Sequence, residues 1–322
     1  MAAKQIIAVA GATGAQGGGL VRAILEDKNG RFTARALTRN PASDKARELA
    51  RLGAEVVGAD LNDAESLNRA FAGADGAFCV TFFWEHFSPA TEMAHARNLA
   101  GAARRAGVEH VIWSTLEDTR EFIPLDDDRM PTLLGSYKVP HLDAKGEADR
   151  FFVEAGVPTT FLATSFYWDN LINFGMGPRP GDDGRLQFVL PMDGAKLPGI
   201  AAEDIGRCAL GIFERGREFH HRRVGIAGEM LTGAEMAAAM TRAFSREVVH
   251  AAVSPQTYRG FGFPGAEDLG NMFQFKRDFE QEFCGRRDLA LSRELNPRLQ
   301  TFAQWLERNK HRIPLEAAAA QE

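Results

Sequence analysis

Three glycines, Gly11, Gly14 and Gly17, follow one another at intervals of three near the N-terminus. The short apolar run before them, residues 6–10, is typical of a strand buried on both faces of a parallel sheet. Gly11 allows a tight turn, Gly14 lets backbone N–H groups approach a pyrophosphate, and Gly17 lets the following helix pack on the strand. The N-terminus of that helix then offers unpaired N–H groups to an anion. The pattern predicts a dinucleotide-binding loop.

A basic residue stands where the second strand of this unit ends. The apolar run at residues 32–38 is followed by Arg39, Asn40 and Pro41, without an acid. Units that bind NAD usually place Asp or Glu here to accept hydrogen bonds from the ribose, whereas arginine can fork onto the 2′-phosphate of NADP. Arg39 therefore predicts a preference for NADP(H), and the alternative is a solvated surface charge.

Two further strand ends carry candidate cofactor contacts. Asp60 and Leu61 follow a strand expected at residues 54–59, and Thr81 follows one expected at residues 76–80. The Asp60 carboxylate could accept a hydrogen bond from the adenine amine or cap the next turn, and both alternatives stay open. The rings that could pack over a nicotinamide, or simply fill the core, are Phe82, Phe83, Trp84 and Phe166.

The elements that would position these residues alternate along the first half of the chain. Strand-like runs are separated by helical patterns, and the pattern that opens after Pro140 places His141 and Lys145 on one face. This alternation predicts an α/β fold with a doubly wound parallel sheet, the Rossmann arrangement, over residues 1–165. Residues 166–322 lack that regularity and predict a smaller C-terminal α+β region for a substrate or partner, interleaved with the first.

A polar stretch between Asp118 and Pro140 is too long for a tight connection, and it contains three consecutive aspartates at residues 126–128. Loops of this length are commonly lids or partner surfaces. A plain solvated loop is the alternative.

Composition narrows the classes of function. The 322 residues carry a formal charge of −5 and no basic run, which argues against direct nucleic-acid binding. No stretch approaches the roughly 20 apolar residues of a membrane span, and the N-terminus has no signal-peptide pattern. Cys79, Cys208 and Cys284 lie far apart and predict neither a disulfide framework nor a metal site. These features are typical of a cytoplasmic protein, and residues 316–322 predict a frayed helical tail.

Several longer segments resemble one family. Beside the glycine loop they are Leu37-Thr-Arg-Asn-Pro41, Ala144-Lys-Gly-Glu147, Phe263-Pro-Gly-Ala266, Asn271-Met-Phe273 and Trp305-Leu306. Over nearly its whole length the chain resembles the NmrA-like branch of the atypical short-chain dehydrogenase/reductase family, in particular its NADPH-sensor members. The resemblance implies a Rossmann domain that binds NADP(H). It also implies that Arg39 holds the 2′-phosphate and that Lys145 holds the nicotinamide ribose. The residues that it implies for the pyrophosphate are Gly11, Thr13, Gly14, Ala15 and Gln16.

One position departs from the dehydrogenases of the wider family. They place Tyr four residues before the active-site lysine, whose charge lowers the pKa of the phenol, and His141 stands there instead. A histidine could transfer a proton from a shorter ring, or it could have no catalytic role. The resemblance therefore favours a regulator that senses NADPH/NADP⁺ and signals through a protein partner. The alternative is an NADPH-dependent reductase of quinones, dyes or other conjugated small molecules, and the oligomeric state is open.

Overall fold

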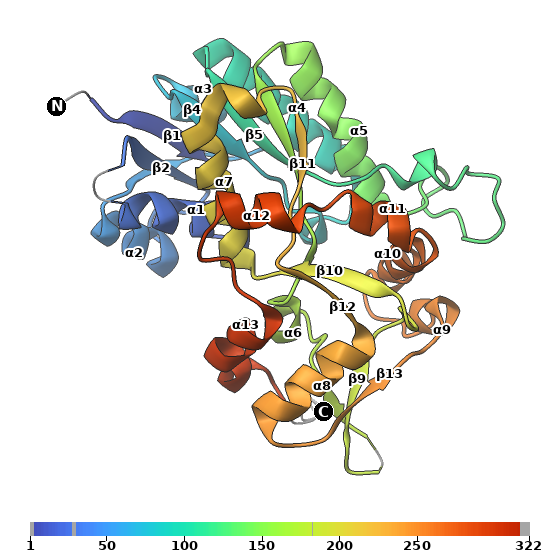
Figure 1. The fold of residues 1–322 in the computed structure, drawn as a ribbon. Helices are drawn as coiled ribbons and strands as arrows, with labels where there is room; N and C mark the ends of the chain where they lie inside the picture. Colours follow the sequence, from blue (N-terminus) through green and yellow to red (C-terminus); the bar gives the residue numbers. More distant parts are fainter. Residues whose placement is uncertain (1–2, 28–29, 182, 316–322) are drawn as a thin grey trace.

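A parallel sheet of seven strands lies at the centre of the computed structural model, which describes residues 3–27, 30–181 and 183–315 (Figure 1). The spatial order is β11-β6-β5-β4-β1-β2-β3, and every neighbouring pair is parallel. This confirms the predicted doubly wound α/β fold. The strands are β1 (Gln5–Val9), β2 (Phe32–Thr38), β3 (Glu55–Gly58), β4 (Gly76–Cys79), β5 (His110–Thr115), β6 (Thr159–Ala163) and β11 (Arg223–Gly225).

Helices cover both faces of this sheet, and each face has its own hydrophobic core. Helix α7, from the second half of the chain, crosses α1 so closely that a Cβ on Gly206 would lie 2.1 Å from the backbone nitrogen of Leu20. One face is covered by α1 (Ala15–Glu26), α2 (Asp44–Leu52), α7 (Ala202–Arg215) and α12 (Leu289–Leu295). The other face is covered by α3 (Ala64–Phe71), α4 (Pro89–Ala106) and α5 (Pro140–Ala155).

The C-terminal region has two small mixed sheets with helices packed around them. Its strands are β7 (Phe166–Tyr167), β8 (Arg179–Pro180), β9 (Leu186–Val189), β10 (Lys196–Ile200), β12 (Glu229–Thr232) and β13 (Val248–Ala251). Its helices are α6 (Asn170–Asn173), α8 (Gly233–Phe244), α9 (Pro255–Arg259), α10 (Ala266–Asp278), α11 (Glu280–Gly285) and α13 (Phe302–Asn309). Short 3₁₀ turns are η1 (Phe83–Glu85), η2 (Thr119–Glu121), η3 (Gly216–Phe219) and η4 (Lys310–Arg312).

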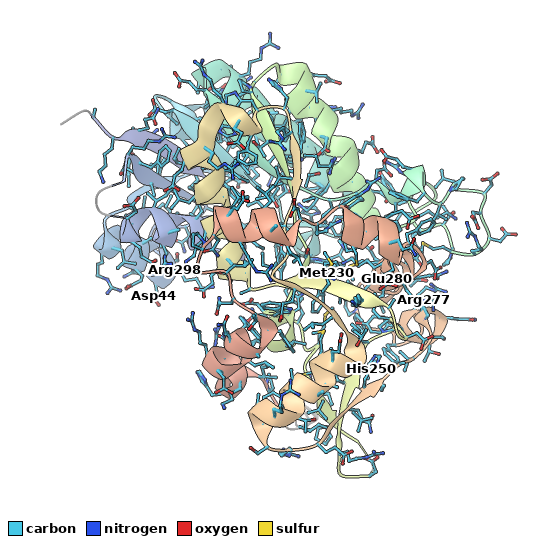
Figure 2. The ribbon with its side chains drawn as sticks, viewed as in Figure 1. Asp44, Met230, His250, Arg277, Glu280 and Arg298 are labelled. Carbon is cyan, nitrogen blue, oxygen red and sulfur yellow. The ribbon has the colours of Figure 1, made fainter. Side chains whose placement is uncertain are left out.

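Polar contacts tie segments of the second half to distant parts of the chain. Arg298 donates to Glu26 at the end of α1 at 2.8 Å, and Glu280 accepts from the backbone nitrogen of Lys196 in β10 at 2.8 Å (Figure 2). Within the described ranges, no helix combines the length and apolar character needed to cross a membrane. The tail expected at residues 316–322 lies outside the described residues.

Candidate cofactor and substrate site

The glycine loop joins β1 to α1 at the point where the strand order reverses, between β1 and β4. Gly11 has φ of +62°, in the left-handed region that favours glycine. A Cβ on Gly17 would lie 2.6 Å from the carbonyl oxygen of Gly11, so α1 approaches the loop closely. Gly14 has φ of −92°, and its added Cβ would meet only the Gly11 oxygen, at 3.2 Å. Gly17 therefore lets α1 pack closely on the loop, whereas Gly14 leaves the space above the loop open.

A cavity of about 1180 Å³ extends from this loop into the C-terminal region. It is bordered by His141 and by all the residues that the sequence analysis assigned to the cofactor. These are Gly11, Thr13, Gly14, Ala15, Gln16, Gly17, Arg39, Asp60, Leu61, Thr81 and Lys145. The fold thus brings the whole candidate set together around one space. Within the described ranges, no cluster of His, Cys, Asp and Glu side chains could hold a metal ion.

Two of these residues contact neighbouring polar groups at the cavity edge. Arg39 forms an ion pair with Glu85 in η1, and both side chains are about half exposed. Such a pair contributes little to stability, so the guanidinium can exchange its partner readily. The Asp60 carboxylate accepts hydrogen bonds from the backbone and side-chain nitrogens of Asn62 at 2.9 and 3.1 Å. These bonds lower the pKa of Asp60, and of the two alternatives the structure contains the turn cap.

Lys145 is held by a buried carboxylate from the neighbouring helix. Its Nζ lies 2.6 Å from Oε1 of Glu92 on α4 and donates to the carbonyl and hydroxyl oxygens of Thr81 at 3.1 and 2.6 Å. Burial by itself would raise the pKa of Glu92, but the Lys145 ammonium and hydrogen bonds outweigh it and lower that pKa to about 2. The lysine therefore borders the cavity in a fixed position with its charge balanced.

His141 is held by a second buried acid, which comes from the C-terminal region. Nδ1 of the imidazole lies 2.7 Å from Oδ1 of Asp268 on α10, whose other oxygen accepts from the His141 backbone nitrogen at 3.2 Å. The Trp84 ring lies 4.7 Å from the imidazole, centroid to centroid. Because Asp268 occupies Nδ1, any proton exchanged with a ligand would pass through Nε2. The histidine is thus oriented and also links the Rossmann sheet to the C-terminal region.

Glu92 and Asp268 were not assigned roles from the sequence, although Glu92 carries a recognisable signal. It lies four residues before Ala96, on the apolar stripe that continues through Leu99 and Ala103. An acid on a buried helix face needs a cation, because an unpaired buried charge is costly. That stripe could have identified Glu92 as a partner for a buried lysine or arginine.

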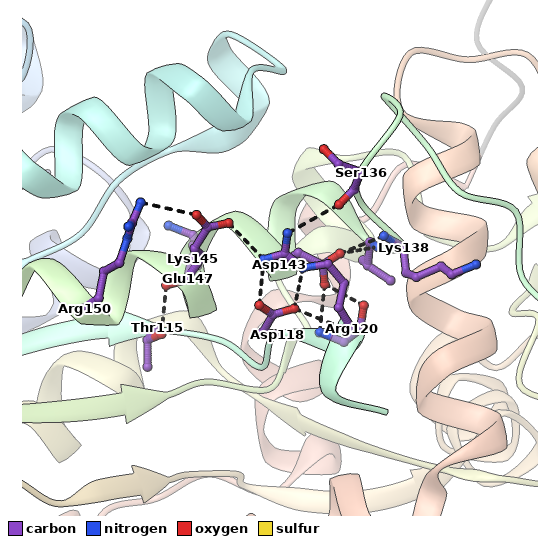
Figure 3. A network of polar contacts seen from close by, with 11 residues as sticks. Thr115, Asp118, Arg120, Ser136, Lys138, Asp143, Lys145, Glu147 and Arg150 are labelled. Carbon is purple, nitrogen blue, oxygen red and sulfur yellow. Dashed lines mark hydrogen bonds and ion pairs between the residues drawn. The ribbon is translucent and has the colours of Figure 1, made fainter. Parts of the chain in front are cut away.

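The long loop after β5 is anchored at both ends by one buried carboxylate. Asp143 on α5 accepts hydrogen bonds from the backbone nitrogens of Thr119, Lys138 and Val139 at 2.8, 2.8 and 3.0 Å. Figure 3 shows Asp143 between the loop segments that carry Arg120 and Lys138. The loop therefore begins and ends at fixed points on α5.

Further contacts hold the middle of the loop. The Lys138 ammonium, which is buried, donates to the carbonyl oxygens of Asp127 and Met130 at 2.8 and 2.7 Å. Asn271 on α10 donates to the carbonyl oxygen of Pro131 at 2.9 Å, and Gln274 donates to that of Arg129 at 2.7 Å. The loop is packed on α10 by buried polar groups, a stronger attachment than the solvated loop considered from sequence.

The sheet order, the glycine turn at the point of reversal and the cavity above it define a Rossmann-type protein with a cofactor-sized site. The chain belongs to the NmrA-like family, whose model matches residues 3–306, and this confirms the resemblance noted in its segments.

Relatives and solved structures agree with this placement. The chain is 30% identical over 288 residues to the NmrA-like family domain-containing oxidoreductase hkm9 of Aspergillus hancockii, covering 84% of this chain and 82% of that protein. It is 26% identical to the oxidoreductase ptmS of Penicillium ochrochloron, covering 95% and 98%. The crystal structure of NmrA, a negative transcriptional regulator, in complex with NADP superposes with a TM-score of 0.78 at 24% identity, covering 95% of each chain. The triphenylmethane reductase of Citrobacter sp., complexed with NADP(H), superposes with a TM-score of 0.73 at 21% identity, covering 94% of this chain and 99% of that one.

Proposed function

We propose that this protein is an NADPH-dependent reductase of a conjugated small molecule. The observation that carries the proposal is the cavity of about 1180 Å³, which exceeds the roughly 300–1,000 Å³ of a pocket for one drug-sized ligand. It continues past the cofactor residues into an apolar chamber bordered by Leu116, Phe166, Val189, Tyr258, Leu269 and Met272. There is room for a cofactor and for a flat apolar acceptor beside it.

The residues around the loop fit a dinucleotide. Within the described part of the chain, the backbone N–H groups of Ala15, Gln16 and Gly17 have no acceptor, and they lie at the start of a twelve-residue helix. An anion such as pyrophosphate would satisfy them. Arg39 would hold the 2′-phosphate and Lys145 the nicotinamide ribose. A bound nicotinamide supplies the hydride. The complexes of NmrA with NADP and with NAD, and that of triphenylmethane reductase with NADP(H), support a nicotinamide cofactor, and Arg39 carries the preference for NADP(H).

The alternative, which the sequence favoured, is a regulator that responds to NADPH and NADP⁺. Such a protein needs a segment that rearranges when the cofactor binds. The candidates are the loop between Asp118 and Pro140 and the C-terminal region, and the contacts of Asp143 and Asn271 hold that loop against α5 and α10. These anchors and the apolar chamber support the reductase over the regulator.

The first test concerns Arg39. We expect Arg39→Ala to weaken NADPH binding by roughly one to two orders of magnitude, because a charge-assisted contact contributes about 1.5–3 kcal/mol. NADH binding should hardly change, since NADH has no 2′-phosphate. In the matched variant Glu85→Gln, which removes the partner of Arg39, NADPH should bind roughly two- to fivefold more tightly. Calorimetry with both cofactors measures these effects, and equal weakening of NADPH and NADH in Arg39→Ala would make Arg39 a structural residue.

A second test separates conjugated acceptors from ordinary ketones. We expect NADPH oxidation with an electron-poor quinone and no detectable turnover of simple ketones, because the tyrosine acid is absent and general acid–base catalysis contributes roughly 10²- to 10⁴-fold. His141→Ala should leave the quinone rate at saturating NADPH within about tenfold of wild type, a barrier change of about 1.4 kcal/mol. If ketones turn over and that activity collapses in His141→Ala with NADPH affinity intact, the His141–Asp268 pair is a working acid.

A further inference from the structure

A buried lysine borders the apolar chamber and takes no part in the cofactor contacts described above. Lys276 lies in the last turn of α10, is 6% exposed and lines the same cavity. Its ammonium lies 5.1 Å from the centroid of the Phe283 ring. In the part of the chain that the structure describes, no group accepts a hydrogen bond from Nζ, and no carboxylate lies within 4.0 Å of it.

The acid whose charge acts on Lys276 is Glu117, and this carboxylate already has a partner. Glu117 forms a buried bidentate ion pair with Arg287, whose Nη2 lies 3.0 Å from Oε2 of Glu117. Burial first, and then the Arg287 charge, lower the pKa of Lys276 to about 7, and Glu117 offsets part of this effect. Most other titratable or charged groups on elements packed against α10 are exposed or bind other partners. They are His141, Asp143, Lys145, Glu147, Asp149, Arg150, Glu154, Lys196, Arg259, Glu280, Glu282 and Cys284. Tyr258 on α9 borders the same cavity, and burial raises the pKa of its phenol to about 12, so this group is neutral at the pH values considered.

We propose that the chamber binds a planar aromatic or conjugated molecule that carries one negative charge, with Lys276 as its counter-ion. The aromatic and aliphatic walls would bury the flat part of such a molecule, and the ammonium would pair with its carboxylate, phenolate or enolate oxygen. An unpaired cation in an apolar site is costly, and an anion removes that cost. The inference rests on the proposed function because ligand and cofactor share one cavity. It also predicts that cationic dyes bind poorly.

The charge of Lys276 gives this binding a definite pH dependence. In the empty chamber the ammonium loses its proton as the pH rises through about 7, whereas a bound anion favours the protonated form and raises the pKa. Affinity for the anion should therefore be constant below that pH and fall by up to about tenfold per pH unit above it. A neutral ligand of the same shape should bind with the same affinity at each pH.

The experiment compares 2-naphthoate with its neutral counterpart 2-naphthamide by calorimetry, on the full chain with and without saturating NADP⁺. At pH 6 we expect naphthoate to bind roughly tenfold or more tightly than the amide. Lys276→Met and Lys276→Gln should remove that preference, and a thermal melt of each variant checks that it is folded. Arg179→Met, which removes another cation on the cavity border, should retain the preference.

The inference is overturned if the two ligands bind equally, if neither binds at millimolar concentration, or if the preference survives in folded Lys276→Met and Lys276→Gln. Loss of the preference in Arg179→Met alone would also overturn it. Titration of NADP⁺ in the same samples keeps this result apart from the proposed function. A chain that binds NADP⁺ without preferring naphthoate contradicts the Lys276 inference alone, whereas a chain that fails to bind NADP⁺ contradicts the cofactor assignment.

Discussion

Lys145→Met is expected to lower the free energy of unfolding by about 3–5 kcal/mol, the usual cost of removing one partner of a buried ion pair. The Glu92 side chain has no exposed area, and the variant would leave its carboxylate without the ammonium that lies 2.6 Å away. Denaturant unfolding of the cofactor-free protein measures the change. This expectation differs from a pure ribose-binding role for Lys145, in which the variant would lose affinity and keep its stability.

The double variant Lys145→Met, Glu92→Gln is the matched control, because it removes both charges and leaves no uncompensated ion. It should recover most of the lost stability. The sign of the pH dependence follows from the lowered pKa of Glu92. The ion pair stabilises the folded protein above pH 4.5, the pKa of Glu92 in the unfolded chain. This stabilisation is lost as the pH falls toward about 2, the pKa of Glu92 in the folded protein. Wild-type stability should therefore fall over this range, and the double variant should lack that part of the fall. A double variant as unstable as Lys145→Met would show that the pair is not the cause.

Gly14→Val is expected to abolish NADPH binding and to leave the apoprotein folded. The added Cβ meets only one protein atom within 4 Å, the Gly11 oxygen at 3.2 Å, and the φ of −92° is accessible to any residue. The valine methyl groups would instead occupy the space above the loop where the pyrophosphate is expected. Calorimetry with NADPH, paired with a thermal melt, checks both halves of the prediction.

Gly17→Val is the matched variant for the opposite effect. Its Cβ would lie 2.6 Å from the Gly11 oxygen and 2.7 Å from the Ala10 oxygen, so the loop and α1 would have to separate. This variant should lose stability even without a cofactor. If Gly14→Val binds NADPH with wild-type affinity, the glycine loop is not part of the cofactor site.

Local patterns were sufficient to predict the sheet and the position of the loop. The strands are short apolar runs, and β2 and β6 begin and end where such runs do. The glycine spacing depends on backbone geometry within a few residues, so sequence alone could identify it. Helix α2 likewise has a serine cap before it and a left-handed glycine after it, both readable from the chain.

The pairing of buried charges could not be predicted in the same way, because it depends on contacts between distant residues. His141 and Asp268 are 127 positions apart, and Glu117 and Arg287 are 170 apart. Lys276 lies one helical turn after Met272 on a buried helix face, where a lysine is unusual. That pattern does not show which cavity the lysine borders. The size of the cavity depends in the same way on tertiary packing, because both the glycine loop and residues of the C-terminal region form its border.

The proposed reductase transfers a hydride from NADPH to a conjugated acceptor bound in the same cavity. The most direct measurement is the stoichiometry of NADPH oxidation with 1,4-naphthoquinone under anaerobic conditions, following cofactor and hydroquinone together. We predict many equivalents of NADPH consumed per protein chain, each matched by one equivalent of hydroquinone, and no consumption by Gly14→Val. Tight NADPH binding with no more than one equivalent oxidised, across a panel of quinones, would contradict the reductase and support a cofactor-sensing role instead.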